Sequence, residues 1–337
     1  MASMRRRPRL EDIAKLCGVS TATVSRILNK DSDFSASVEV RKRVLETTQR
    51  VGYAPDLAAR NLNRKQTNLI GVFASPYTHF SAGINEPLLD GIAEVIHSQD
   101  YDAFFEISRR TPTANVLPFW RFDGAILLQS PPPEITLALD ARHVPYISLN
   151  EVIGKPVSTV LADDIMGTTL AMQHFFELGH RRIAYANAHK VAFPHYSISE
   201  RHDTVTRWSQ QHGMQVVDGH DVRFESADNF LANTVITQRA TAVLSYDHQI
   251  GIQLLSAASR LGLKVPDDFS LICFNDLFPV AELFPALTAV AVSGLAMGKM
   301  AGSLLIQSIT GNGADLPSQI KLPEKLVVRS STGPAKE

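Results

Sequence analysis

Residues 20 to 29, STATVSRILN, combine small polar side chains with one arginine at helical spacing. Thr21 and Ala22 open the expected helix, and Arg26 follows one turn later on the same face. An arginine can donate two hydrogen bonds to O6 and N7 of guanine, and an alanine or threonine methyl can contact the methyl group of thymine. The spacing therefore predicts that these three residues contact DNA bases. The smaller polar residues of the segment are expected to contact phosphate or to cap the helix: Ser20, Thr23, Ser25 and Asn29.

Two short amphipathic helices must position these side chains. In the first, apolar or small residues recur at i, i+3, i+4 and i+7, at positions 10, 13, 14 and 17. Gly18 can end this helix in the left-handed conformation, and the hydroxyl of Ser20 can cap the next one. The second helix buries Val24, Ile27 and Leu28 and exposes the polar face. The pattern is that of a helix-turn-helix whose second helix enters the major groove, although helix spacing alone also fits two ordinary core helices.

The distribution of charge favours the DNA-binding interpretation. The first 65 residues contain 14 Lys or Arg and 7 Asp or Glu, a net charge of +7, whereas the remainder contains 19 and 27, a net charge of −8. The whole-chain charge of −1 hides this difference. A basic head on an acidic body is what neutralisation of DNA phosphates requires, and a merely solvated surface would spread both signs evenly.

Longer segments carry a resemblance to a known family. EDIAKLCGVSTATVSRILN and RKRVLETTQRVGYAPDLAARNL are followed, in order, by TNLIGV, FDGAIL, ELGHRRIAY, TAVLSYD, RLGLKVPDDFSLICFND and PALTAV. With these segments the chain resembles the lactose-repressor (LacI/GalR) family of bacterial transcription regulators over nearly its whole length. The resemblance implies a small all-α helix-turn-helix headpiece. It also implies an α/β body, like a periplasmic binding protein, with two doubly wound parallel-sheet subdomains.

The body alternates apolar strands with helical stretches from Asn68 onwards, which predicts parallel sheets. The candidate strands are LIGVFA, YDAFFEI, GAILLQ, VPYISL, RIAYAN, TAVLSY and FSLICF. From the resemblance we expect a headpiece over 1–55, a hinge and linker over 56–67, a first subdomain over 68–162 and 290–319, and a second over 163–289 and 320–332. The chain is expected to cross between the subdomains near 161–164, 289–291 and 317–321.

Three local features surround this organisation. A third headpiece helix is expected to turn Val40, Val44 and Val51 inward and to stop at Tyr53-Ala54-Pro55, because the residue before proline avoids the helical region. Residues 56–63 are too short to form a stable helix alone. The resemblance implies that this hinge helix forms when two copies meet on DNA, with Leu62 wedged into the minor groove. Between YDAFFEI and FDGAIL the chain is too short for the full helix of the family, so we expect a truncated segment over 108–123.

The resemblance also carries the effector-binding positions over, residue by residue. Arg201 stands at the position of the pocket arginine, although Thr204 replaces the glycine that usually follows. Asp247, Asn275 and Asn150 match other polar pocket positions, and Asn275 stands where aspartate is usual. We expect Arg201 to provide the opposite charge near Asp247. An aromatic surface is expected from Phe224, or from Phe80. Together these side chains suit a polyhydroxylated ligand, because each can bond adjacent hydroxyl groups.

Other classes of protein receive little support. The sequence has no CxxC or HExxH motif, so no metal and no cofactor are expected, and the histidines lack a partnered serine or cysteine motif for catalysis. The Asp163-Asp164 pair, at a crossing between subdomains, is interpreted as structural. Cys17 and Cys273 are expected to be reduced core residues. No run of about 18 apolar residues and no apolar signal segment is present, so we expect a cytoplasmic protein without a membrane contact.

The sequence thus predicts a homodimeric DNA-binding transcriptional regulator, favouring a repressor, on pseudo-palindromic operator DNA. A small effector, favoured to be a carbohydrate, would bind between the subdomains and change the operator affinity. The alternative from another class is a solute-binding or sugar-processing protein that uses the same cleft without DNA. An activator and a tetramer also remain open, although the tail LVVRSSTGPAKE shows no leucine heptads.

Overall fold

The computed structural model describes residues 8–28, 34–53, 66–74, 83–107, 122–128, 133–154, 157–187, 195–217, 227–311 and 316–336. Residues 1–67 and 68–337 form two compact units, each considered by itself. The predicted hinge helix over 56–63, with Leu62, lies outside the described residues, as do Phe80, Asn29, Phe224 and most of the shortened 108–123 segment. Among the described helices, none has the length and apolar character needed to cross a membrane.

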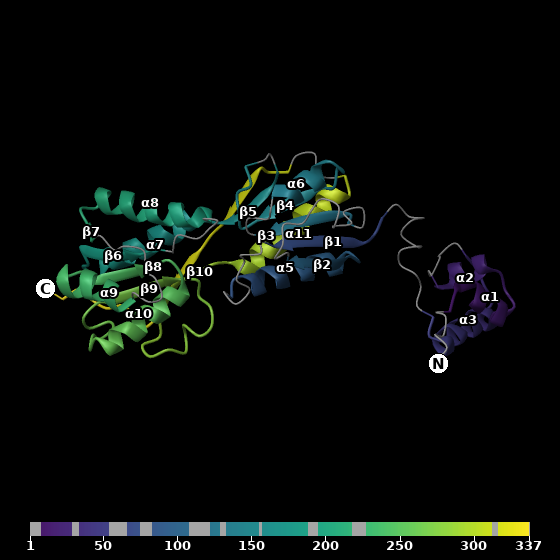
Figure 1. Cartoon of the computed structure of the whole chain (residues 1–337), viewed down its shortest axis with the longest axis horizontal. Coiled ribbons are helices and arrows are strands. Elements are labelled where there is room, and N and C mark those ends of the chain that lie inside the picture. The colour runs from purple at the N-terminus through teal and green to yellow at the C-terminus, as the bar shows by residue number, and fades with distance from the viewer. Residues whose placement is uncertain are drawn as a thin grey trace, which may run out of the picture. The chain divides into compact units, whose positions relative to one another are not determined.

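The described residues of the headpiece form three helices around a small apolar core (Figure 1). They are α1 (Leu10–Cys17), α2 (Thr21–Leu28) and α3 (Val38–Val51). The core contains Ile13, Ala14, Cys17, Val24, Ile27 and Val44, so the faces predicted for all three helices are confirmed. Because Cys17 is buried and unpaired, it is a core residue, as predicted.

Both ends of α3 follow from local chemistry. The Ser37 hydroxyl accepts a hydrogen bond from the Val40 amide at 3.3 Å, which caps the first turn. At the other end, Gly52 adopts φ 65°, the left-handed conformation in which glycine is favoured. The prediction that Tyr53-Ala54-Pro55 stops this helix was wrong, because Gly52 already ends it.

The body contains two six-stranded sheets. The first sheet has the order β11-β5-β4-β3-β1-β2, and all its neighbouring strands pair in parallel. Its strands are β1 (Leu69–Ala74), β2 (Asp102–Ile107), β3 (Gly124–Leu128), β4 (Tyr146–Leu149), β5 (Thr159–Ala162) and β11 (Gln319–Leu322). Helices α5 (Asn85–Ser98), α6 (Pro133–Asp140) and α11 (Gly294–Ile309) accompany this sheet.

The second sheet has the order β12-β10-β9-β8-β6-β7, in which only β12 is antiparallel to its neighbour. Its strands are β6 (Arg182–Ala186), β7 (Gln215–Val217), β8 (Ala242–Ser245), β9 (Ser270–Phe274), β10 (Thr288–Ala291) and β12 (Lys325–Val327). Its helices are α7 (Asp164–Glu177), α8 (Tyr196–Gln211), α9 (Ala227–Leu231) with the π-helical η4 (Ala232–Thr237), and α10 (His248–Arg260). All seven predicted strands are therefore present, distributed over two parallel-type sheets as expected.

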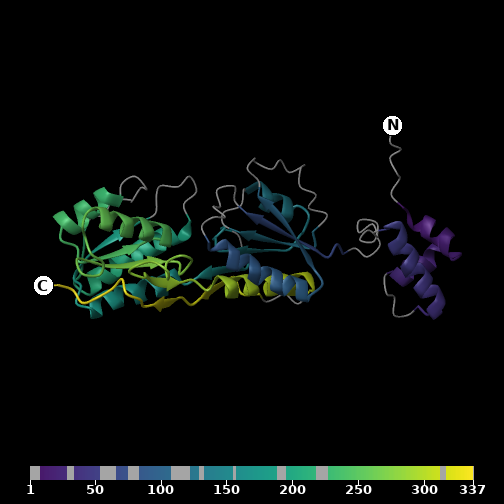
Figure 2. The same cartoon turned by 90° about the horizontal axis from the view of Figure 1, so that it is seen from below.

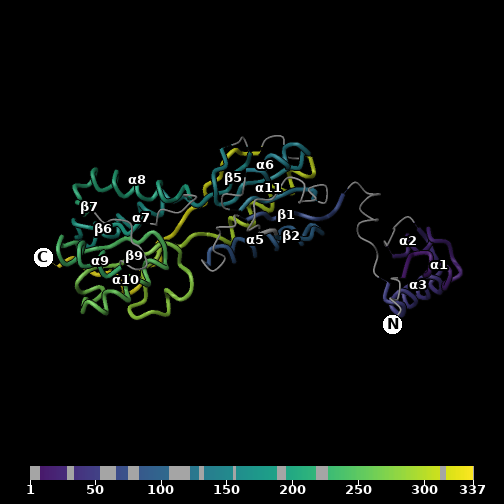
Figure 3. Tube along the Cα trace, viewed as in Figure 1, coloured from purple at the N-terminus to yellow at the C-terminus, as the bar shows by residue number. Residues whose placement is uncertain are grey.

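Three segments connect the two sheets, and the trace can be followed in Figure 3. The first connection, between β5 and α7, lies where it was predicted. The second follows Ala291 rather than residue 289, because β10 pairs with β9 and β12 in the second sheet. The third follows Leu322, because β11 pairs with β5 through that residue. The predicted boundaries at 290 and 319 therefore move to about residues 292 and 323.

Two glycines let α5 and α11 approach closely, and Figures 1 and 2 show these helices side by side. A Cβ atom on Gly91 would lie 2.2 Å from the Leu295 carbonyl oxygen, and one on Gly298 would lie 2.1 Å from the Leu88 carbonyl oxygen. No side chain fits at either position, so the backbones are in direct contact. This packing holds α11 in the first subdomain although the strand before it belongs to the second.

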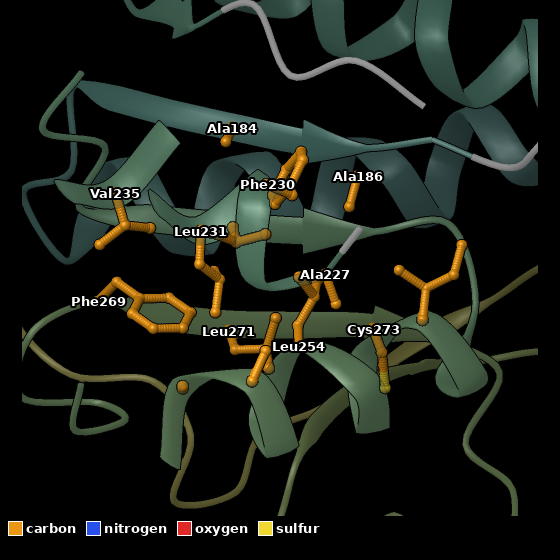
Figure 4. Close-up of a cluster of buried hydrophobic side chains, with 14 of the residues drawn as sticks. Ala184, Ala186, Ala227, Phe230, Leu231, Val235, Leu254, Phe269, Leu271 and Cys273 are labelled. Atoms are coloured by element: carbon orange, nitrogen blue, oxygen red, sulfur yellow. The ribbon is translucent and has the colours of Figure 1, made fainter. Parts of the chain in front are cut away.

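The second subdomain has its own core between β6, β8 and β9 and helices α9 and α10 (Figure 4). Phe230 and Leu231 of α9, Leu254 of α10, and Leu271 and Cys273 of β9 meet there. Cys273 is fully buried and unpaired, and burial raises the pKa of its thiol, so it too is the inert core residue that was predicted.

Candidate functional site

The exposed face of α2 has the geometry of a recognition helix. Thr21, Ala22 and Arg26 are exposed, whereas Val24 and Ile27 on the opposite face are 0% and 2% exposed. Gly18, at φ 62°, makes the tight turn before it. The Arg26 guanidinium lies over the Phe34 ring at 5.3 Å from the centroid, which supports the long side chain without consuming its hydrogen-bond donors. The methyl groups of Thr21 and Ala22 and the guanidinium of Arg26 thus lie on one exposed face of the helix.

Ser20 and Thr23 serve the start of the same helix. The Ser20 hydroxyl accepts a hydrogen bond from the Thr23 amide at 3.1 Å, and the two hydroxyl groups lie 2.9 Å apart. The predicted capping role of Ser20 is confirmed by these contacts. Ser25 is half-buried on the flank of the helix. Contact of any of these residues with DNA stays a prediction.

In the body, three predicted effector residues lie within two residues of the carboxyl end of a strand. Asn150 follows β4, Asp247 follows β8 with one residue between, and Asn275 follows β9. Asn150 and Asn275 have left-handed φ values of 58° and 67°. Their backbone N–H groups donate to the carbonyl oxygens of Val160 and Val290, which lie on the next strand of each sheet. The two asparagines therefore occupy equivalent positions in the two sheets.

Asp247 has a structural task as well. Its carboxylate accepts a hydrogen bond from the Ile250 amide at 2.8 Å and caps α10. A carboxylate at a helix N-terminus is also stabilised by the helix dipole. One carboxylate oxygen of Asp247 is therefore already engaged in holding its own helix.

Arg201 does not follow a strand; it lies in the second turn of α8 and is 5% exposed. Its Nε donates to Oδ1 of Asp164 at 2.5 Å, and its Nη1 donates to the Tyr246 carbonyl oxygen at 2.6 Å. The guanidinium lies over the Phe274 ring at 3.8 Å. The expectation that Arg201 supplies the charge opposite Asp247 was wrong, because Asp164 at the start of α7 is its ion-pair partner.

The substitution at Thr204 leaves the local fold intact. Thr204 is buried within α8, and its hydroxyl donates to the Glu200 carbonyl oxygen at 2.7 Å, one turn earlier. A threonine hydroxyl satisfied in this way fits inside a helix. Arg201 therefore sits on a continuous helix and not on a disturbed turn.

A second buried carboxyl lies beside this ion pair. Glu324, in the third connection between the sheets, is 1% exposed, and neither of its carboxyl oxygens has a hydrogen-bond partner among the described residues. It fits because residue 167 is glycine: a Cβ there would lie 1.6 Å from Oε2 of Glu324. Burial, and then repulsion by Asp164, raise the pKa of Glu324 well above its ordinary value, although Arg201 opposes this. The raised pKa favours the protonated, neutral form of Glu324.

His195 connects this cluster to the first sheet. It precedes α8, and its ring lies 2.6 Å from the Asn150 carbonyl oxygen through Nε2. Burial lowers the pKa of His195, which keeps the imidazole neutral. On the other side of the ring, Nδ1 accepts a hydrogen bond from the Ser197 amide at 3.3 Å and lies 2.7 Å from the Ser197 hydroxyl.

The sequence reasoning missed Asp164, Glu324 and His195 as members of this site. The Asp163-Asp164 pair carried a usable signal, because two acids directly after a buried strand point to a helix cap and a site residue. Asp163 does cap α7, through the Met166 amide at 3.0 Å, and Asp164 turns inward. Nothing in the local sequence indicates the burial of Glu324 or the position of His195, since both depend on contacts with distant segments.

The chain is similar to known proteins over almost its whole length. The family described as "Bacterial regulatory proteins, lacI family" matches residues 9–56, and the "Periplasmic binding protein-like domain" matches residues 172–332. The NTD biosynthesis operon regulator NtdR of Bacillus subtilis is 25% identical, with 96% of this chain and all of that protein covered. The HTH-type transcriptional repressor CytR of Escherichia coli K12 is 27% identical, with 96% of each covered.

Solved structures give the same result for the fold. A lac repressor dimer bound to operator and the anti-inducer ONPF superimposes with a TM-score of 0.83 at 22% identity, covering 97% of this chain and all of that one. A CelR-cellobiose complex gives a TM-score of 0.69 at 25% identity, covering 96% and 100%. The two-part architecture predicted from sequence is confirmed. With a headpiece that matches the lacI family of bacterial regulatory proteins and a two-sheet body that matches the periplasmic binding protein-like domain, the chain has the two-part architecture of the lacI-family regulators to which it is similar.

Proposed function

We propose that this protein is a homodimeric transcriptional repressor whose operator affinity is controlled by a small effector bound at the carboxyl ends of the two sheets. The observation that carries the proposal is the pairing of an exposed recognition face at Thr21, Ala22 and Arg26 with a buried polar cluster around Arg201. The first face suits DNA bases, and the second suits a small ligand. Relatives named as repressors support the direction of regulation.

The effector that fits this cluster best is a neutral polyhydroxylated molecule, such as a sugar. Arg201 is neutralised by Asp164, and the guanidinium is partly covered by Phe274, so it provides no free positive charge for an anion. Asn150, Asn275 and Asp247 provide amide and carboxylate groups that can each bond hydroxyl groups. The CelR relative, whose structure contains cellobiose, supports a carbohydrate.

The DNA-binding part is tested by selecting duplexes from a random pool with the full-length chain. We expect a pseudo-palindromic consensus, a dimer on the DNA by sedimentation, and preference for the selected over a scrambled duplex. A chain that binds no duplex at low salt would contradict the proposal and favour the alternative, a solute-binding or sugar-processing protein. The proposed activity consists of binding alone, and no catalytic step is assigned to it.

The effector part is tested by titrating the complex with the selected duplex against neutral sugars, cellobiose included, and against phosphorylated and carboxylated sugars. We expect a neutral sugar to change the operator affinity, and Asn275→Ala to abolish that response without weakening DNA binding in its absence. Gln210→Ala, on the exposed surface of α8, is the matched control. A response to anionic sugars only would contradict the proposed effector class.

A further inference from the structure

Helix α8 contacts the first subdomain through two side chains near its N-terminus. His195 forms a hydrogen bond with the carbonyl oxygen of Asn150, the residue that follows β4. Glu200 forms an ion pair with Lys321 of β11, with Nζ–O distances of 2.8 and 3.1 Å. Arg201, the next residue along, points into the second subdomain toward Asp164. One rigid helix therefore carries both the central arginine of the site and the contacts across to the other subdomain.

The chemistry of the partners fixes the direction of the hydrogen bonds around His195. A carbonyl oxygen can only accept, so Nε2 of His195 carries the proton, and Nδ1 of the neutral ring accepts. The Ser197 hydroxyl, 2.7 Å from Nδ1, is then the donor to it. The Tyr246 hydroxyl, 2.9 Å from the same oxygen, donates to Ser197 in turn. The result is one directed chain from Tyr246 through Ser197 and His195 to Asn150.

This chain meets the effector cluster at both ends. The Tyr246 carbonyl oxygen accepts from Nη1 of Arg201, at 2.6 Å. Asn150 is one of the two left-handed asparagines at the sheet ends. A ligand that moves either Arg201 or Asn150 must therefore strain or break a bond of the chain. His195 is half-buried and Asn150 is buried, so a carbonyl oxygen of Asn150 left without its partner is unfavourable.

Resting on the proposed function, we propose that His195 is the residue that couples the effector site to the relative position of the two subdomains. It acts as a positioning residue through the hydrogen bond from Nε2 to Asn150. The Glu200–Lys321 pair assists it but contributes less, since both side chains are more than a quarter exposed and such pairs are weak. Breaking the His195 bond frees the first subdomain locally while both sheets remain folded.

Hydrogen exchange of the full-length chain, without DNA or ligand, tests this directly. His195→Phe keeps an aromatic ring beside Tyr196, where the native rings are tilted by 43°, but removes both nitrogens. His195→Gln retains an amide that can donate to Asn150. In the phenylalanine variant we expect exchange in peptides 146–152 and 195–201 to rise at least tenfold, with strands β3 and β8 unchanged. In the glutamine variant we expect values near those of the wild type.

Unchanged exchange in both peptides, or a uniform rise across both sheets, would overturn the proposal. The uniform rise would show that His195 only stabilises the fold. Ser197→Ala interrupts the same chain one bond earlier, so it provides the test if His195→Phe does not fold. His97→Phe, an exposed position at the end of α5, is the control for adding an aromatic ring.

Operator affinity provides the second measurement. On a duplex selected by the wild type, we expect His195→Phe to change the dissociation constant at least fivefold, with His195→Gln and His97→Phe within twofold. A selective rise in exchange with unchanged operator affinity would overturn the coupling role. If the wild type binds no duplex, the proposed function fails, and the exchange measurement still decides whether His195 holds the subdomains together.

Discussion

At the residue scale, Arg26 is the side chain on which recognition of a DNA sequence depends most. It is exposed, lies on the same helix face as Thr21 and Ala22, and packs over Phe34. Its guanidinium is the only group among these three that can form two hydrogen bonds with one base edge. The two smaller residues contribute methyl contacts and leave room for the duplex.

We expect Arg26→Ala to reduce the preference for the selected over a scrambled duplex by about 1–3 kcal/mol, the value of a bidentate base contact. Fluorescence anisotropy with both duplexes measures the ratio. Arg207→Ala, an exposed arginine of α8 in the body, removes the same charge and should leave the ratio unchanged. An equal ratio in Arg26→Ala and the wild type would show that Arg26 does not contact bases.

Glu324 makes stability depend on pH. The folded protein holds the Glu324 proton more tightly than the unfolded chain does, so its favourable contribution is complete below the ordinary pKa of about 4.5 and is lost as the pH rises. We therefore compare the free energy of unfolding of Glu324→Gln with that of the wild type at pH 5 and at pH 8. We expect this difference to shift in favour of the variant by about 1 kcal/mol or more between pH 5 and pH 8. Urea unfolding at both pH values measures this difference. Parallel stability curves for the two proteins would contradict the pKa shift.

At the element scale, the contact between α5 and α11 has no room for side chains at its centre. We expect Gly298→Ala to destabilise the body by about 1–3 kcal/mol, the usual result of overpacking, because its Cβ would overlap the Leu88 carbonyl oxygen. Gly302→Ala is the graded control, since its Cβ would meet the Val95 side chain at 3.1 Å. The midpoint of urea unfolding should fall more for the first variant than for the second.

The C-terminal tail is held against the second sheet by a buried histidine. His180 contacts the Thr241 and Ser270 hydroxyls at 2.9 and 3.0 Å and the Gly333 carbonyl oxygen at 3.1 Å. Burial lowers the pKa of His180 to about 4. The stability that it provides is therefore present above pH 6.5 and is lost as the pH falls toward 4. We expect His180→Gln to flatten this loss, measured by thermal unfolding between pH 7 and pH 4; an unchanged pH profile would contradict it.

Elements with a strong local pattern were predictable from sequence, whereas contacts between distant segments were not. The seven apolar strands and the roles of Gly18 and Ser20 in the headpiece follow from runs of residues within one segment, whereas Asn150 and Asn275 were carried over from the family resemblance. The shorter strands β5, β7 and β12 are defined mainly by their neighbours in the sheets. Arg201 was assigned the wrong carboxylate, because pairing with Asp164 depends on how α7 and α8 pack. Glu324 is buried only because residue 167 lacks a side chain.

At the scale of the whole molecule, charge is divided between the two units. The segment that contains the headpiece carries +7 and the rest −8, so the net charge of −1 does not describe how the protein meets a polyanion. We expect the affinity for mixed-sequence duplex to fall at least tenfold between 50 and 200 mM salt, as release of counterions from the phosphates requires. Anisotropy titrations over this range measure the slope. An affinity independent of salt would contradict phosphate binding by the headpiece.

The three connections between the sheets are also bonded to one another. The Asp163 amide donates to the Leu322 carbonyl oxygen at 2.9 Å, and the Ser293 hydroxyl donates to the Pro323 carbonyl oxygen at 3.1 Å. Because the three connections are bonded to one another, sliding or stretching them would break these hydrogen bonds. Twisting or bending can move the connections as a unit. A rotation of one subdomain against the other therefore displaces all three connections together.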